Sequence, residues 1–168
     1  MTQAFHRLDD TLSAVINAWL DSGKPSGAVA KKSDWKAQEF SKPHSVKANF
    51  RISDNNFARI RHGLLPEEME DKWFSYYDDG RIHLHRSWTG AKIYEAAVYK
   101  GEGCYAISEI IVERDAELYS STDDSEDVRS FNFLLGRGIL GYRVEAPIDT
   151  ESSDDVIRGW SSFGNMIL

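Results

Sequence analysis

Residues 64–94 read LLPEEMEDKWFSYYDDGRIHLHRSWTGAKIY, and this stretch decides the fold predicted for the chain. It contains two runs of strand-like residues, 72–77 and 81–88, separated by Asp78-Asp79-Gly80. An Asp-Gly pair between two such runs is a strong signal for a tight β-hairpin. We therefore expect two antiparallel strands that hold aromatic, histidine and arginine side chains close together.

Further turns extend this hairpin into a sheet. Thr89-Gly90 leads into a strand over residues 92–99, and Gly101-Glu102-Gly103 leads into another over residues 104–114. Residues 46–52 alternate between polar and apolar side chains, as a half-buried strand does. The sequence therefore predicts an antiparallel meander of four to five strands.

Helices are expected before and between these strands. Apolar residues at helical spacing predict a helix over residues 8–20, which Gly23 and Pro25 end. Ser53 is the expected cap of a short helix that ends at Gly63. Pro66 is expected to open one further helical turn.

Two more helices are expected after an acidic loop over residues 115–127. Thr122 or Ser125 would cap the first, which ends near residues 136–138. Ser153 would cap the second, with Val156, Ile157 and Trp160 on one face. The predicted class is a single α+β domain, made of an N-terminal helix and irregular connector (1–45), a sheet core (46–115) and C-terminal helices (116–168).

Composition favours one globular core. The chain has 168 residues, of which 41% are hydrophobic and 12% aromatic, enough for a core without disulfides or a metal. The lone Cys104 lies in an expected strand and indicates a small buried residue in a reducing compartment. Neither a membrane-length apolar run nor a secretory leader is visible. We expect a soluble cytoplasmic protein with no cofactor and no membrane association.

Charge is divided unevenly along the chain. Residues 1–63 hold ten Lys or Arg against six Asp or Glu, whereas residues 64–168 hold ten against twenty-one. A nucleic-acid partner is not expected, because phosphate binding needs clustered cations and no nucleic-acid motif is present. The basic residues between positions 31 and 51 are interpreted as a solvated connector with two anchoring aromatic side chains; they are Lys31, Lys32, Lys36, Lys42, Lys47 and Arg51, interrupted by Trp35 and Phe40.

Alternation along residues 81–88 places His83, His85 and Ser87 on one side of the strand. The spacing of His83 and His85 suits two ligands of one metal, but no third ligand is placed near them. Two solvent-facing histidines on the polar side of the strand explain the same pattern and are favoured. His83 and His85 therefore remain weak candidates for a metal site.

Arg86 shares the other side with Ile82, Leu84 and Trp88, which is an apolar layer. A buried arginine needs a partner, and an ion pair with Glu70 or Asp71 is the structural interpretation. The functional alternative is a cleft in which Arg86, between Trp73 and Trp88, binds a phosphate or carboxylate. The candidate ligand-binding residues are Glu70, Asp71, Trp73, His85, Arg86 and Trp88.

The same stretch resembles a family of small, largely uncharacterised bacterial proteins. The shared pattern is L-P-x-x-M-E-D-K-W-F, then a D-G turn, then H-R-S-W-T-G and I-Y, which this chain spells within residues 65–94. The resemblance covers residues 52–115, less than half of the chain. It implies a bacterial origin and no known activity.

Three hypotheses about function follow. The first is a binding or regulatory protein without catalytic activity, such as an antitoxin-like or immunity-like protein whose acidic part covers a basic partner. The second is a binder or hydrolase of a nucleotide-like, phosphorylated compound, which uses the face of Arg86 and Trp88. The third is a metal-dependent enzyme that uses His83 and His85.

Overall fold

The computed structural model describes residues 29–144, 146–147 and 161–167. The helices expected over residues 8–20 and from Ser153 to Trp160 lie outside these residues. The strands are β1 (Pro43–Ile52), β2 (Trp73–Asp78), β3 (Arg81–Arg86), β4 (Lys92–Ala97), β5 (Tyr99–Lys100) and β6 (Tyr105–Glu113). The helical elements are the 3₁₀ turn η1 (Lys32–Asp34), α2 (Asp54–His62), α3 (Asp124–Phe133), its π-helical continuation η2 (Leu134–Ile139) and the 3₁₀ turn η3 (Gly164–Ile167).

The expected α+β class with an antiparallel sheet is confirmed. The strand order is β1-β6-β4-β3-β2, and the short β5 pairs with β6 beside this path. β2, β3 and β4 form the predicted meander. Their first turn has positive φ at Asp79 (49°) and Gly80 (72°), as a hairpin turn of type I′ requires. The strand expected over residues 92–99 is divided in two, because the chain after Ala97 turns into the β5–β6 hairpin.

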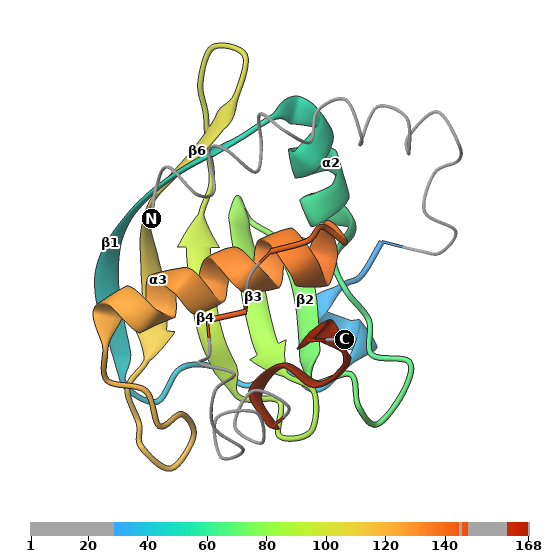
Figure 1. Cartoon of the computed structure of the whole chain (residues 1–168), viewed down its shortest axis with the longest axis vertical. Coiled ribbons are helices and arrows are strands. Elements are labelled where there is room, and N and C mark those ends of the chain that lie inside the picture. The colour runs from blue at the N-terminus through green and yellow to red at the C-terminus, as the bar shows by residue number, and fades with distance from the viewer. Residues whose placement is uncertain (1–28, 145, 148–160, 168) are drawn as a thin grey trace.

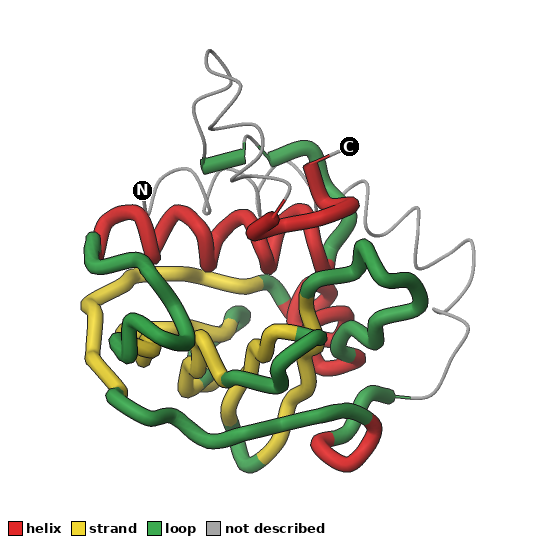
Figure 2. Tube along the Cα trace, turned by 90° about the horizontal axis from the view of Figure 1, so that it is seen from below, coloured by secondary structure: helices red, strands yellow, loops and turns green. Residues whose placement is uncertain are grey.

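The sheet is covered on both faces (Figures 1 and 2). α3 crosses one face, where Phe131 packs on Phe50 and Tyr94 with ring centroids 5.5 and 5.9 Å apart. The other face is crossed by residues 30–42, which we name the strap; Figure 2 shows it on the far side of the strands from α3. The strands that carry the predicted site therefore form the middle of three layers, between α3 and the strap.

The strap changes the environment of β3. Trp35 anchors it, since its indole Nε1 donates to the Ser87 carbonyl at 2.7 Å. Ala30 is buried with Phe74 beneath it. The expectation that His83 and His85 face solvent is therefore wrong, because their side of the sheet lies under the strap, where His85 is fully buried.

The two inner helices begin and end partly as expected. Ser53 accepts a hydrogen bond from the Asn56 N–H, and Gly63 ends α2 with a φ of 80°, as predicted. At α3 the cap is Asp123 rather than Thr122 or Ser125, because its carboxylate accepts from the first backbone N–H groups of the helix. The helical continuation η2 passes through Gly136 and Gly138 and ends at Ile139, one residue beyond the expected range.

Two other local expectations are corrected. The segment after Pro66 is not helical and forms a hydrogen-bonded loop turn. In this turn the Asp71 carboxylate accepts hydrogen bonds from the Glu67 and Glu68 N–H groups at 2.9 and 3.0 Å. Cys104 lies half-buried in the bend before β6 rather than inside the strand. In the described ranges, no helix has both the length and the apolar character needed to cross a membrane.

Candidate functional site

A cavity of about 460 Å³ lies between the sheet, the first turns of α3 and the C-terminal segment. Its floor comes from β2, β3 and β4, and its sides come from the loop before α3, from α3 itself and from the residues that precede η3. The described residues that line it are Trp73, Arg86, Tyr94, Leu118, Tyr119, Ser120, Ser121, Thr122, Asp123, Glu126, Ser130, Pro147, Ser161, Ser162 and Phe163.

Arg86 ends β3 on the face that packs against α3. Its guanidinium donates to the carbonyl oxygens of Ser161 and Ser162 at 2.8 and 2.6 Å. The expected ion pair with Glu70 or Asp71 is therefore wrong. The physical reason is local, since the Asp71 carboxylate is turned back onto its own loop by two backbone N–H groups.

The charge of Arg86 is not neutralised within the described part of the chain. Burial lowers the pKa of the guanidinium, because the desolvated cation is less stable than a hydrated one. Its two carbonyl partners are dipoles and carry no net charge. They use two of the five N–H donors of an arginine, so three donors remain for another acceptor.

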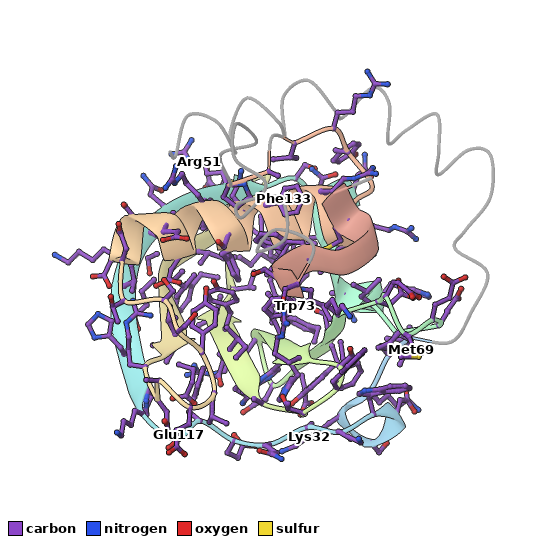
Figure 3. The ribbon with its side chains drawn as sticks, turned by 60° about the horizontal axis from the view of Figure 1, so that its bottom comes forward. Lys32, Arg51, Met69, Trp73, Glu117 and Phe133 are labelled. Atoms are coloured by element: carbon purple, nitrogen blue, oxygen red, sulfur yellow. The ribbon has the colours of Figure 1, made fainter. Side chains whose placement is uncertain are left out.

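Trp73 forms the floor beside Arg86. Its ring centroid lies 5.1 Å from the Arg86 guanidinium carbon and 6.0 Å from the ring centroid of Tyr94. The indole Nε1 donates to the Ser162 carbonyl at 2.8 Å, and only 2% of Trp73 is exposed. Figure 3 shows it in the interior of the molecule. Trp73 therefore supports Arg86 and has no open face on which a ligand ring could stack.

Two tyrosine hydroxyls and a buried carboxylate lie at the α3 side of the floor. The hydroxyls of Tyr94 and Tyr119 are 2.6 Å apart, and that of Tyr119 lies 3.0 Å from Asp127 Oδ1. Arg114 pairs with Asp127 Oδ2 at 2.6 Å, which balances the carboxylate. Burial raises the pKa of both tyrosines, so their hydroxyls are neutral and protonated at neutral pH.

Of the six predicted ligand-binding residues, the structure brings Trp73 and Arg86 to the cavity. Trp88 lies outside it, 56% exposed, where its Nε1 donates to the Met69 carbonyl at 2.9 Å and its ring lies under Lys72. Glu70 is exposed on the same loop. Arg86 therefore contacts the indole ring of Trp73 but does not lie between the rings of Trp73 and Trp88.

His85 lies on the opposite face of the sheet. Its Nδ1 lies 2.9 Å from the Gly90 carbonyl, so this nitrogen carries the proton and donates. The buried Nε2 has no hydrogen-bond partner within the described ranges. Burial lowers the pKa of His85 to about 4. The same layer holds the buried Lys92, whose Nζ pairs with Glu39 and Glu95 at 3.0 Å each.

The two histidines do not form a metal site with other described residues. His83 stacks on Tyr76 with ring centroids 4.5 Å apart, and its Nδ1 lies 3.7 Å from Glu95 Oε2. Within residues 29–144, 146–147 and 161–167, no group of three or more His, Cys, Asp or Glu side chains could hold a metal ion. The metal-dependent hypothesis therefore has no structural support in this region.

Several lining residues were not predicted. Tyr94 belongs to the opening stretch, but only its register opposite Leu84 and Val112 places it beside Trp73. Tyr119 and Glu126 lie in and after the acidic loop, which by itself indicates only a helix start. Both residues line the cavity only because that loop folds back over the sheet.

Comparison with family models, with curated proteins and with solved structures gives no match for this chain. The interpretation of the cavity therefore rests on its own geometry.

Proposed function

We propose that this protein binds a small molecule that carries a carboxylate or phosphate group in the cavity at Arg86. The observation that supports the proposal is the unneutralised guanidinium on the wall of a cavity of about 460 Å³. A volume of this size lies in the range of about 300–1,000 Å³ that is common for small-molecule sites.

The Arg86 guanidinium is a partly buried charge. A guanidinium that is removed from water without a counter-ion costs several kcal/mol. Among the described residues, two carbonyl dipoles and the Trp73 ring alone compensate it here. A ligand carboxylate or phosphate would supply the missing negative charge and could accept two parallel N–H···O bonds from the planar fork.

The proposal does not require a nucleobase. Trp73 is buried against Tyr94, and Trp88 is outside the cavity, so neither indole offers a stacking surface beside Arg86. Ser120, Ser121 and Thr122 line the cavity, and this polar stretch would suit a polar ligand. The chemical class that the residues favour is therefore a polar organic anion.

Calorimetric titration with phosphate, succinate, sugar phosphates and ADP-ribose tests this function. At about 100 times its dissociation constant, a ligand that binds the native state stabilises it by about 2.7 kcal/mol, so a thermal-shift screen should identify hits first. Arg86→Lys should weaken binding of a hit by about tenfold or more, because an ammonium cannot form the bidentate contact.

Arg51→Gln is the matched control, since Arg51 is exposed on β1 and far from the lining residues (Figure 3). It should bind like the wild type. Equal binding by wild type and the folded Arg86→Lys variant, or no binding of any anion in the panel, would contradict the proposal.

Binding of a protein partner, of the antitoxin-like or immunity-like kind, is a second candidate function. It is favoured by large apolar side chains that remain exposed at one end of the molecule. Met69 is 69% exposed, Trp88 56% and Trp35 40%. They are linked through the backbone contacts of Trp35 with Ser87 and of Trp88 with Met69. Exposed aromatic and methionine side chains are enriched at protein interfaces.

A further inference from the structure

We infer that the ligand of this cavity is a zwitterion, whose anionic group binds Arg86 and whose ammonium group binds Glu126. The inference rests on the proposed function, because it assigns the ligand class of the same site. It follows from the different chemistry of two walls, the β3 wall that carries Arg86 and the α3 wall that carries Glu126.

Glu126 is the carboxylate of the α3 wall that has neither a cation nor a backbone N–H donor as partner among the described residues. Arg114 is shared by Asp124 and Asp127, at 2.8 and 2.6 Å. Asp123 is engaged as the helix cap by the N–H groups at the start of α3. Glu126 is half-buried and lines the cavity, and among the described residues its carboxylate makes neither an ion pair nor a side-chain hydrogen bond.

The tyrosines beside this wall cannot donate to a ligand while they keep their present contacts. Tyr94 and Tyr119 contact each other at 2.6 Å, and both contact Asp127 Oδ1, at 3.3 and 3.0 Å. The carboxylate can only accept, so the two hydroxyl protons are used within this group of three. The hydroxyl groups of the two tyrosines therefore offer no proton to an anionic group of a ligand on this wall.

A simple anion would therefore satisfy only one side of the cavity. It would neutralise Arg86 but leave the Glu126 carboxylate uncompensated in the same confined space, where like charges repel. A ligand with both a carboxylate or phosphate and an ammonium group compensates both. The volume of about 460 Å³ has room for a ligand larger than a single α-amino acid, such as an ω-amino acid or a dipeptide.

Titration calorimetry with matched pairs of probes tests the ligand class. Three pairs differ in the ammonium group alone: 4-aminobutyrate against butyrate, 6-aminohexanoate against hexanoate, and phosphoethanolamine against ethyl phosphate. In a fourth pair, alanylalanine against N-acetylalanylalanine, a neutral acetamide replaces the ammonium group. In at least one pair the zwitterion should bind the wild type about tenfold or more tightly than its partner, as a hydrogen bond between two charged groups contributes.

The Glu126→Gln variant should remove this difference, because the zwitterion loses its ion pair. The partner without ammonium, which Glu126 no longer repels, should bind at least as tightly as it binds the wild type. Glu117→Gln is the matched control, because Glu117 is an exposed carboxylate of the neighbouring loop outside the lining (Figure 3). This variant should keep the full preference for the zwitterion.

The outcomes separate the two proposals. If both members of every pair bind equally and binding depends on Arg86, the anion site stands and the zwitterion inference is overturned. If the preference exists but survives in Glu126→Gln, Glu126 is not the partner of the ammonium and the inference is again overturned. If no probe of any pair binds but an anion of the first panel does, the anion site stands and the inference is overturned. If neither set binds, the proposed function fails together with the inference. The matched probes are compared on the wild-type protein. This comparison therefore still tests the ligand class if Glu126→Gln does not fold.

Discussion

His85 and Arg86 are neighbours on β3 whose side chains enter opposite layers of the molecule. His85 is fully buried under the strap, and Arg86 lies against the α3 side. Both are polar groups that burial disfavours in their charged forms, yet the consequences differ. The histidine loses its charge at neutral pH because burial lowers its pKa to about 4, whereas the arginine stays charged and requires a counter-ion.

The titration of His85 gives a pH dependence of stability. The pKa is about 4 in the folded protein and 6.5 in an unperturbed side chain, so the unfolded state binds more protons between these values. Stability therefore falls as the pH decreases through this window, by about 2 kcal/mol between about pH 7.5 and about pH 5. The pKa of His83 is also lowered by burial and acts in the same direction.

Denaturant unfolding at these two pH values measures the effect. The carboxylates with lowered pKa values lose their contribution mainly below about pH 4.5, so the upper part of the window belongs to the histidines. In His85→Gln the loss should be clearly smaller than in the wild type. A variant that shows the full loss would exclude His85 as its source.

The strap covers the sheet face opposite α3 and so buries the side chains on that face. Its C-terminal end is fixed by Glu113, the last residue of β6, which is fully buried. The Glu113 carboxylate accepts from the N–H groups of Ser41 and Lys42 at 2.8 Å each and of Asp115 at 3.0 Å. Burial alone would raise the pKa of this carboxyl, but the backbone donors hold it below its usual value.

Glu113→Gln should destabilise the fold by about 2–3 kcal/mol. The substitution replaces one acceptor oxygen by an amide N–H₂ group that faces a backbone donor, and an unsatisfied buried group costs about this amount. The exposed Glu109 on the same strand accepts from the Ser45 hydroxyl and from no other residue that the structure describes. Glu109→Gln is thus the control, and it should change the free energy of unfolding by less than about 1 kcal/mol. Similar effects of the two changes would show that the strap is not held at Glu113.

At the scale of the whole molecule, the cavity is made by three stretches that are far apart in the sequence. The segment before η3 supplies the carbonyls that hold Arg86 and Trp73, and it is positioned by Gly164. Gly164 has a φ of 59°, and a Cβ there would overlap with the Glu70 carbonyl oxygen. Glu70 therefore matters through its backbone, as the surface on which the C-terminal segment rests.

Gly164→Ala should move this segment away from β2 and β3 and weaken anion binding at Arg86 by about tenfold or more, as expected when charge-assisted contacts lose their geometry. Gly141→Ala is the control, because Gly141 has a similar φ of 77° but nothing lies within 4 Å of an added Cβ. Both variants carry the strain of a left-handed residue, about 1–2 kcal/mol. Only the first has the steric overlap. Titration calorimetry and tryptophan fluorescence report the difference, and equal binding by the two variants would contradict this role for the C-terminal segment.

The sequence by itself determined the sheet and its turns. Asp78-Asp79-Gly80 and the alternation of residues 81–88 act over a few neighbouring positions, so the hairpin and the two faces of β3 could be predicted from local rules. The same rules found Ser53 and Gly63 at the ends of α2. They also identified Arg86 as a charge in an apolar layer.

Only the tertiary structure decided what each face meets. The strap buries His85, and the Ser161 and Ser162 carbonyls replace the carboxylates expected for Arg86. Tyr119 and Glu126 join the cavity because the acidic loop and α3 fold over β4. These contacts join residues between 25 and 76 positions apart. No local pattern specifies such pairs, because each depends on the path of a separate segment across the sheet.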